Sequence, residues 1–215
     1  MGDKSSLSIN DLIRTGWETF RARPWLLLGA LLIVWVFSVI PGMLNNLWED
    51  NAFMVFVTTV VFMIPQLILG MGFIRIVLDL LSGKPTGIQE LFSQYPLFIR
   101  FLLGSLLYNI IVFLGLILLI IPGIYLGIRL QFFSYFIVDK GMGPVESIKA
   151  SFELTRGHEL DLFLLGIVAM ILNILGALAL MLGLLVSIPV TMLALGQAYR
   201  DLKGNEAPAA PAPVA

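Results

Sequence analysis

Four stretches of the chain carry almost no charge, and this feature limits its fold more than any other. Residues 24–48, 51–74 and 162–199 contain no Asp, Glu, Lys or Arg, and residues 101–138 contain only Arg129. A transmembrane helix needs about 20 predominantly apolar residues, so the two shorter runs fit one span each and the two longer runs fit two. Of the 215 residues, 59% are apolar and 13% are charged. A charged share of roughly half the soluble average excludes a disordered chain and an ordinary soluble enzyme.

These runs predict an all-α fold, a polytopic integral membrane bundle of six transmembrane helices arranged as three hairpins. The predicted spans are residues 25–43, 53–80, 97–121, 123–139, 161–180 and 183–202. Proline removes an amide donor and glycine accepts turn geometry, so Pro122 and Gly123 mark the turn in the third run. The turn in the fourth run is expected near residues 181–183, with Pro189 as a kink in the last helix.

The span predicted over residues 123–139 is at the short limit for crossing a membrane, so a re-entrant segment is the alternative there. We expect one integral membrane domain over residues 1–204. The Ala/Pro-rich tail over residues 205–215 is expected to be disordered.

Lysine and arginine lie on one side of the predicted bundle. They precede the first span, flank the link between spans two and three, lie between spans four and five, and follow span six (Lys4, Arg14, Arg21, Arg23, Lys84, Arg100, Lys140, Lys149, Arg156, Arg200 and Lys203). The turns on the other side have neither residue, and the first holds Glu49 and Asp50. By the positive-inside rule, both termini are expected in the cytoplasm of a prokaryotic cell, below its inner membrane. The polar first 23 residues are not typical of a cleavable signal peptide.

A short amphipathic segment precedes each odd-numbered span. Residues 8–20, 86–95 and 144–156 have apolar side chains at helical spacing opposite charged or polar ones. We expect all three to be elbow helices that lie along the inner membrane surface. Three copies of an elbow plus a hairpin suggest an internal repeat. The alternative is that any hairpin membrane protein with cytoplasmic loops produces such a pattern.

Arg129 is the one charged side chain deep inside a predicted span. Counted at 1.5 Å per residue from Gly123, it lies roughly 9 Å inside the outer end of span four, and an ionisable residue at such a depth indicates a functional site. No acid is expected at that depth. Its donors are therefore predicted to bond to side-chain carbonyls, or to backbone carbonyls freed near Pro65 or Pro189.

An unpaired positive charge would then remain at Arg129, and an anionic headgroup or substrate could approach it. The candidate ligand-binding or anion-binding residues are Arg129, Gln131, Asn109, Asn173 and Gln66. The alternative is that the long side chain of Arg129 reaches the outer headgroups.

Little else in the sequence indicates catalysis. There is no cysteine, and the single histidine, His158, has no second histidine with which to hold a metal. No phosphate-binding loop or nucleophile motif is present. Asp79 follows Arg75 by four residues and is expected to pair with it on one helix face. We therefore expect no enzyme activity, no cofactor and no metal site.

Two parts of the sequence resemble a known family. Residues 121–125 (Ile-Pro-Gly-Ile-Tyr) lead to 137–141 (Ile-Val-Asp-Lys-Gly), and residues 143–151 (Gly-Pro-Val-Glu-Ser-Ile-Lys-Ala-Ser) lead to 155–158 (Thr-Arg-Gly-His). Together they resemble a broad set of uncharacterised prokaryotic multi-pass membrane proteins. That set includes the membrane domain attached to some glycerophosphodiester phosphodiesterases and the YciC-like inner-membrane proteins. The resemblance implies a prokaryotic cell-membrane protein and supplies no catalytic residues.

Three functions fit these features. The first is a non-enzymatic membrane protein that binds or organises lipid, with an anionic headgroup as one option, or a membrane partner such as a second copy. The amphipathic segments favour it. The second is a small transporter or channel with a midplane polar site around Arg129, favoured by Pro65 and Pro189 within spans. The third, an intramembrane enzyme, lacks a visible nucleophile. A net charge of −1 predicts no nucleic-acid partner.

Overall fold

The computed structural model describes residues 7–48, 50–179 and 181–205, and every regular element in this part is a helix. In chain order these are α1 (Ile9–Ala22), α2 (Pro24–Leu47), α3 (Ala52–Leu81), α4 (Glu90–Ser93), the 3-10 turn η1 (Tyr95–Leu97), α5 (Phe98–Leu118), α6 (Ile120–Leu130), α7 (Phe133–Lys140), α8 (Pro144–Leu154), α9 (Glu159–Leu178) and α10 (Leu184–Asn205). The predicted tail lies outside the described residues from position 206 onward.

Local sequence explains where two of the predicted elbow segments become helical. The Ser8 side chain accepts a hydrogen bond from the Asp11 amide at 3.4 Å and so caps α1. Pro144 is the first residue of α8, where its missing N–H costs no helix bond. The Glu146 carboxylate accepts a hydrogen bond from the Gly143 amide at 3.2 Å. The structure therefore has helices at both of these segments.

The helix predicted over residues 86–95 is wrong. Only the four residues of α4 are helical there, and η1 follows directly. Leu91 is fully buried, and its backbone lies so close to Gly72 of α3 that a Cβ atom at Gly72 would collide with it. Docking against α3 therefore fixes this segment, and Pro85 and Gly87 at its start do not favour a longer helix.

The turn predicted at Pro122-Gly123 is also wrong, because it lies at Leu119. The Leu119 backbone is extended, with φ −162° and ψ 144°, and α6 begins at the next residue. Pro122 lies in the first turn of α6, where proline is tolerated. Gly123 instead lets α6 approach α5, since a Cβ atom on Gly115 would lie 3.0 Å from the Gly123 Cα. The span predicted over residues 123–139 is not one helix but α6 followed by α7.

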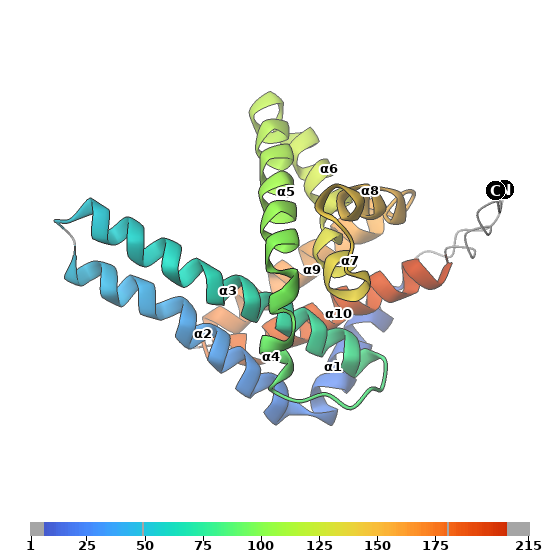
Figure 1. Cartoon of the computed structure of the whole chain (residues 1–215). Coiled ribbons are helices and arrows are strands. Elements are labelled where there is room, and N and C mark those ends of the chain that lie inside the picture. The colour runs from blue at the N-terminus through green and yellow to red at the C-terminus, as the bar shows by residue number, and fades with distance from the viewer. Residues whose placement is uncertain (1–6, 49, 180, 206–215) are drawn as a thin grey trace, which may run out of the picture.

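The long helices pack in pairs on a shared base. α2 packs against α3, α5 against α6 and α9 against α10. In Figure 1 the α2–α3 pair points to the left and the α5–α6 pair points upward, so the two pairs diverge. The base consists of α1, α4, α7, α8 and the adjoining ends of α3, α5 and α10, and it contains most of the buried apolar residues. Most of the large exposed apolar side chains lie on the pairs, away from the base.

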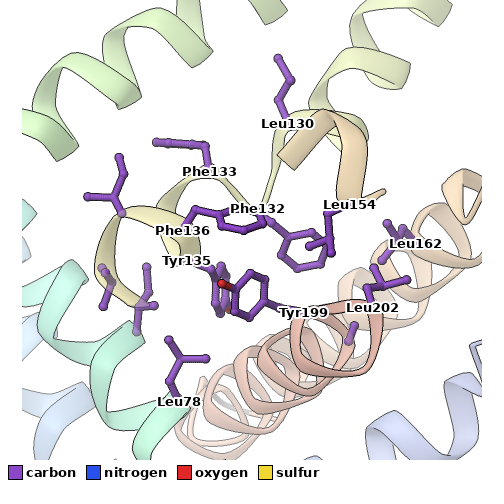
Figure 2. Packing of buried hydrophobic residues seen from close by; sticks show 14 of the residues in the cluster. Leu78, Leu130, Phe132, Phe133, Tyr135, Phe136, Leu154, Leu162, Tyr199 and Leu202 are labelled. Carbon is purple, nitrogen blue, oxygen red and sulfur yellow. The ribbon is translucent and has the colours of Figure 1, made fainter. Parts of the chain in front are cut away.

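Aromatic residues fill the centre of the base. Phe132, Tyr135 and Phe136 surround Tyr199 of α10, with ring centroids 5.8, 5.3 and 5.2 Å from the Tyr199 ring. Figure 2 shows these side chains pointing toward one another. The buried Tyr199 hydroxyl donates a hydrogen bond to the Asp139 carboxylate at 3.0 Å, as a buried phenol requires. This packing fixes the position of α7 and therefore of the break that precedes it.

Five helical stretches in the described residues are long and apolar enough to cross a membrane: Pro24–Leu47, Ala52–Leu81, Glu90–Leu118, Ile120–Lys140 and Glu159–Leu178. α10, which was predicted as the sixth span, is not among them. Its second half carries Arg200, Asp201 and Lys203. The chain is therefore compatible with a membrane protein, and the number and direction of its crossings stay predictions.

Candidate functional site

The break between α6 and α7 brings Arg129 into a buried polar cluster. α6 ends at Leu130, α7 begins at Phe133, and the two residues between them form a turn. Arg129 is the penultimate residue of α6, and its side chain is only 3% exposed. A guanidinium group keeps its charge when buried, so neighbouring residues have to neutralise that charge and accept its donors.

Two acceptors from different helices meet the Arg129 guanidinium. One terminal nitrogen forms an ion pair with Glu159, the first residue of α9, and the other donates to the backbone carbonyl of Phe152 in α8 at 2.6 Å. The guanidinium also lies over the Phe152 ring, 3.9 Å from its centroid. The Nε of Arg129 is buried with no hydrogen-bond partner among the described residues. The charge is therefore compensated inside the protein, and the buried Nε–H is left without a partner among the described residues.

Two hydroxyl groups, from Ser151 of α8 and from Thr155 directly after its end, hold the backbone at the break. The Ser151 hydroxyl donates to the Arg129 carbonyl at 2.9 Å and accepts from the Phe132 amide at 3.0 Å. The Thr155 hydroxyl donates to the same Arg129 carbonyl at 3.1 Å. Backbone groups that lose their helix partners at a break need other partners when buried. These two side chains supply them, so α8 and the break stabilise each other.

The acceptors predicted for Arg129 are wrong. Asn109 is exposed and donates to the Ser105 carbonyl at 2.7 Å. Asn173 donates to the Thr191 hydroxyl at 3.5 Å, within the α9–α10 pair. Gln66 is exposed on α3, and the side-chain nitrogen of Gln131 is buried without a partner among the described residues.

Asn109 and Asn173 therefore form their hydrogen bonds elsewhere, and no hydrogen bond joins Arg129 to a candidate side chain among the described residues. The expectation that no acid lies near Arg129 is also wrong, because Glu159 pairs with it. The premise of an anion site at Arg129, an unpaired positive charge, is therefore lost.

A weak signal in the sequence pointed to the true partners. Ser151 and Thr155 are hydroxyl residues four positions apart, at the spacing that puts two side chains on one helix face, and both are buried. Glu159 follows one turn later. Counting residues along a straight span could not place these groups beside Arg129, because the span is broken after Leu130.

The cluster has little capacity for chemistry. Arg129 and Glu159 neutralise each other, and the nearby His158 ring lies 3.4 Å from the Asp161 carboxylate. Among the residues that the structure describes, no three His, Asp or Glu side chains gather as a metal ion would require. The predicted pair of Arg75 and Asp79 is confirmed, with 3.0 Å between Nε and the carboxylate, and it too is a structural ion pair.

Two apolar cavities lie between the helix pairs. One, of about 390 Å³, lies between α6 and α9 beside the Arg129 cluster and is lined by Ile121, Ile124, Tyr125, Ile128, Glu159, Leu160 and Phe163. The other, of about 320 Å³, lies between α2 and the α9–α10 turn and is lined by Leu31, Leu32, Trp35, Met181, Leu182, Leu184, Leu185 and Ile188. Only the first contains a charged residue.

A third cavity, of about 330 Å³, is polar and lies where α3, α7 and α10 end. Its cations already have partners: Lys203 pairs with Asp139 at 2.5 Å, and Arg200 donates to the Leu81 carbonyl at the end of α3. Cations at the carboxyl ends of helices compensate the partial negative charge there. This cavity is therefore explained by the stabilisation of helix ends.

Comparison with known proteins gives a family but no activity. A family model described as a domain of unknown function, DUF7847, matches residues 98–214. Over 130 residues the chain is 35% identical to uncharacterised protein Rv2560 of Mycobacterium tuberculosis and to uncharacterised protein Mb2590 of Mycobacterium bovis. These matches cover 60% of this chain and 39% of each relative, so the chain spans well under half the length of the relatives it matches. No solved structure matches it significantly.

These matches support an uncharacterised prokaryotic family. They give no support to the narrower resemblance to the glycerophosphodiester phosphodiesterase membrane domain or to the YciC-like proteins. That resemblance stays a prediction.

Proposed function

Because this chain belongs to the family of the domain of unknown function DUF7847, whose description assigns no activity, we propose a role from its physical chemistry. The chain is a non-enzymatic, multi-pass protein of a prokaryotic cell membrane that binds and organises membrane lipid. The observation that carries this proposal is the pair of apolar cavities between diverging helix pairs, since a groove of this kind fits an acyl chain.

Exposed apolar surface supports the membrane part of the proposal. Large apolar side chains are exposed along the helix pairs, and contiguous exposed apolar surface on this scale is unfavourable in water. Exposed charged side chains are instead found on the base, among them Arg14, Glu18, Lys149 and Arg156. The pairs therefore belong in lipid and the base at its polar boundary.

The positive residues of the base support a cytoplasmic position for it, by the positive-inside rule. α1 packs along α10, so the first and last described helices lie together. This contact supports a topology in which both termini are cytoplasmic.

The cavity between α6 and α9 is the proposed lipid site. Six of its seven lining residues are apolar or aromatic, and the seventh is Glu159, the ion-pair partner of Arg129. An acyl chain would lie against the apolar residues, and the headgroup would lie near the charged pair. Because that pair is electrically neutral, the site has no preference for a strongly anionic headgroup.

Native mass spectrometry of the detergent-purified chain tests this site. In Ile124→Trp the larger side chain fills the α6–α9 cavity, and we expect one fewer tightly retained phospholipid than in the unmodified chain. Ile110→Trp is the matched control, because Ile110 on α5 is exposed to a similar extent (47% against 45%) and lines neither apolar cavity. Equal lipid retention in both variants and the unmodified chain would contradict the proposal.

A small transporter or channel is the alternative, and the broken helix at Arg129 favours it. Against it, Gln66 and Asn109 are exposed on different helix pairs and share no path with Asn173. Liposomes that contain the purified chain test this alternative. Rapid release of a small entrapped ion or dye, above that of protein-free liposomes, would favour it over lipid organisation.

A further inference from the structure

Two of the three turns between paired helices are apolar throughout. Residues 116–121, which join α5 to α6, read Leu-Ile-Leu-Leu-Ile-Ile, and residues 177–185, which join α9 to α10, contain only Ala, Leu, Met and Gly. The turn between α2 and α3 differs, because Asn45, Asn46, Asp50 and Asn51 surround it. A turn that emerges into water on the far side of a membrane is normally polar. Only the α2–α3 turn has that character.

The α5–α6 turn exposes almost all of its apolar surface. Leu118 is 77% exposed, and Ile120 and Ile121 are 70% and 80% exposed. No part of the described chain covers them. The transfer of such side chains from water into an apolar environment is favourable, so the turn belongs in hydrocarbon.

The length of α6 sets how deep this turn can lie. α6 has 11 residues, which span about 16 Å, roughly half of the 30 Å hydrocarbon layer. Its other end is fixed at the polar boundary, because Arg129 bonds to α8 at the Phe152 carbonyl. The neighbouring side chains of Glu153 and Arg156 are 66% and 75% exposed, and such charges are not stable in hydrocarbon. The α5–α6 turn therefore reaches only about the middle of the membrane.

The contacts of the α9–α10 turn with α2 indicate that this turn lies at a similar depth. Its residues Leu182 and Leu185 share the 320 Å³ cavity with Leu31 and Trp35 of α2. These two α2 residues lie about 10 and 17 Å beyond Pro24 along the helix axis, so the turn lies beside the middle of α2. α9 has enough residues to cross a membrane, but the turn that follows it lies beside the middle of α2 and not beside its far end.

The backbone of the α9–α10 turn is suited to hydrocarbon. The amides of Met181, Leu184 and Ser187 donate to carbonyls within the same turn, at 3.0, 3.1 and 2.8 Å. In the α5–α6 turn the Leu119 amide donates to the Gly115 carbonyl at 3.0 Å, and Pro122 has no amide to leave unpaired. Backbone groups inside a membrane need partners within the protein, because no water is available there.

The distribution of Trp and Tyr distinguishes the α2–α3 pair from the other two helix pairs. Trp25 and Trp48 lie at opposite ends of α2 and are both exposed, about 35 Å apart along the helix. Tryptophan prefers the two interfaces of a membrane, and this separation matches a full crossing. Residues 109–121 and 166–188, which contain the two apolar turns, include no Trp or Tyr.

We infer that only the α2–α3 pair crosses the membrane, and that the α5–α6 and α9–α10 pairs are re-entrant wedges whose turns end among the acyl chains near the bilayer midplane. This inference rests on the proposed insertion of the chain into a membrane, and it replaces six crossing spans with two. The partner of the two apolar turns is the hydrocarbon of the cytoplasmic leaflet. The chain therefore displaces more lipid from that leaflet than from the outer one.

Single-cysteine labelling tests this topology, and the chain has no cysteine of its own. The four full-length variants are Asn46→Cys in the α2–α3 turn, Leu119→Cys and Met181→Cys in the two apolar turns, and Lys149→Cys on the base. Each is treated with a membrane-impermeant maleimide in spheroplasts and in inside-out vesicles, and denaturation in detergent then shows that the thiol is present.

We expect Asn46→Cys to react only from the outside and Lys149→Cys only from the inside. Leu119→Cys and Met181→Cys should react from neither side, with rates at least tenfold lower than that of Asn46→Cys. A nitroxide attached at Leu119→Cys or Met181→Cys in liposomes should respond to oxygen and not to a polar nickel complex. Outside labelling of either apolar turn at the rate of Asn46→Cys overturns the inference alone. Failure of Asn46→Cys to react from the outside overturns the proposed crossing as well.

Discussion

Among single residues, Arg129 makes the contacts that hold three helices together at the break. Its side chain joins α6 to α8 and α9, and its carbonyl is held by Ser151 and Thr155. The sequence marked this position as unusual because a charge lay in an apolar run, and that signal was informative. The interpretation of Arg129 as an anion site did not hold, because its partners come from segments that are distant in the sequence. Counting residues along one span could not place them near Arg129.

Replacement of Arg129 by leucine should destabilise the fold without removing any catalytic group. Arg129→Leu leaves Glu159 without its counter-charge and the Phe152 carbonyl without its donor, and we expect a loss of about 2–4 kcal/mol in the free energy of unfolding. The lower end is expected because the Glu159 side chain is 29% exposed. Reversible unfolding in mixed micelles measures this change.

The control is Lys149→Leu on the exposed surface of α8, which should change the free energy of unfolding by less than about 0.5 kcal/mol. Arg129→Lys should lie between the two, since lysine keeps the charge and loses the forked geometry. Equal stability of Arg129→Leu and the unmodified chain would show that the cluster does not hold the break.

Ser151 offers a test of the backbone bonds at the break. Ser151→Ala removes the acceptor of the Phe132 amide and a donor to the Arg129 carbonyl, and both groups are buried. An unpaired buried backbone group costs about 1–3 kcal/mol, so the loss of stability should fall in this range. Ser93→Ala is the control, because Ser93 is exposed on α4, and it should have almost no effect in the same unfolding assay.

At the scale of the elements, the packing of α1 on α10 depends on a single glycine. A Cβ atom at Gly16 would lie 2.5 Å from the Val190 carbonyl oxygen and 3.2 Å from the Ala194 amide nitrogen. Gly16→Ala should therefore push α1 away from α10 and lower the free energy of unfolding by about 1–3 kcal/mol. The expected readout is faster trypsin cleavage after Arg21, which follows this contact.

Gly166→Ala is the matched control for this substitution. Gly166 is also helical, and nothing lies within 4 Å of the position that its Cβ would occupy. Alanine should be neutral or stabilise the helix by up to about 1 kcal/mol. If the two variants show the same cleavage rate, the close contact of α1 with α10 is not important for stability.

Most of the long helices could be predicted from the sequence because hydropathy reports them directly. The positions of α2, α3 and α9 agree with the predicted spans to within a few residues, and Pro189 does lie inside α10. The wrong predictions concern segments whose conformation is determined by packing against other helices. Pro122 lies in the first turn of α6 instead of in a turn between helices, and residues 86–95 dock through Leu91 without forming the expected helix.

At the scale of the whole molecule, the base and the helix pairs have surfaces suited to two different environments, water and lipid. The base buries its aromatic centre around Tyr199 and exposes charges, as a water-soluble domain does. The pairs diverge from it (Figure 1) and expose apolar side chains, as membrane segments do. The charge-free runs of the sequence give the lengths of helices and not their directions, so they predicted one bundle of three hairpins where the structure has diverging pairs.

Photolabelling from within the bilayer tests the central claim, that the helix pairs lie in lipid and the base does not. The full chain is reconstituted with a phospholipid that carries a diazirine at the end of its acyl chain, and adducts are mapped by mass spectrometry after irradiation. The account predicts adducts at residues 113–121 and 181–186 and in the middle of α2, with none on α1, α4 or α8. Adducts spread evenly over the base and the pairs, or missing from both apolar turns, would contradict it.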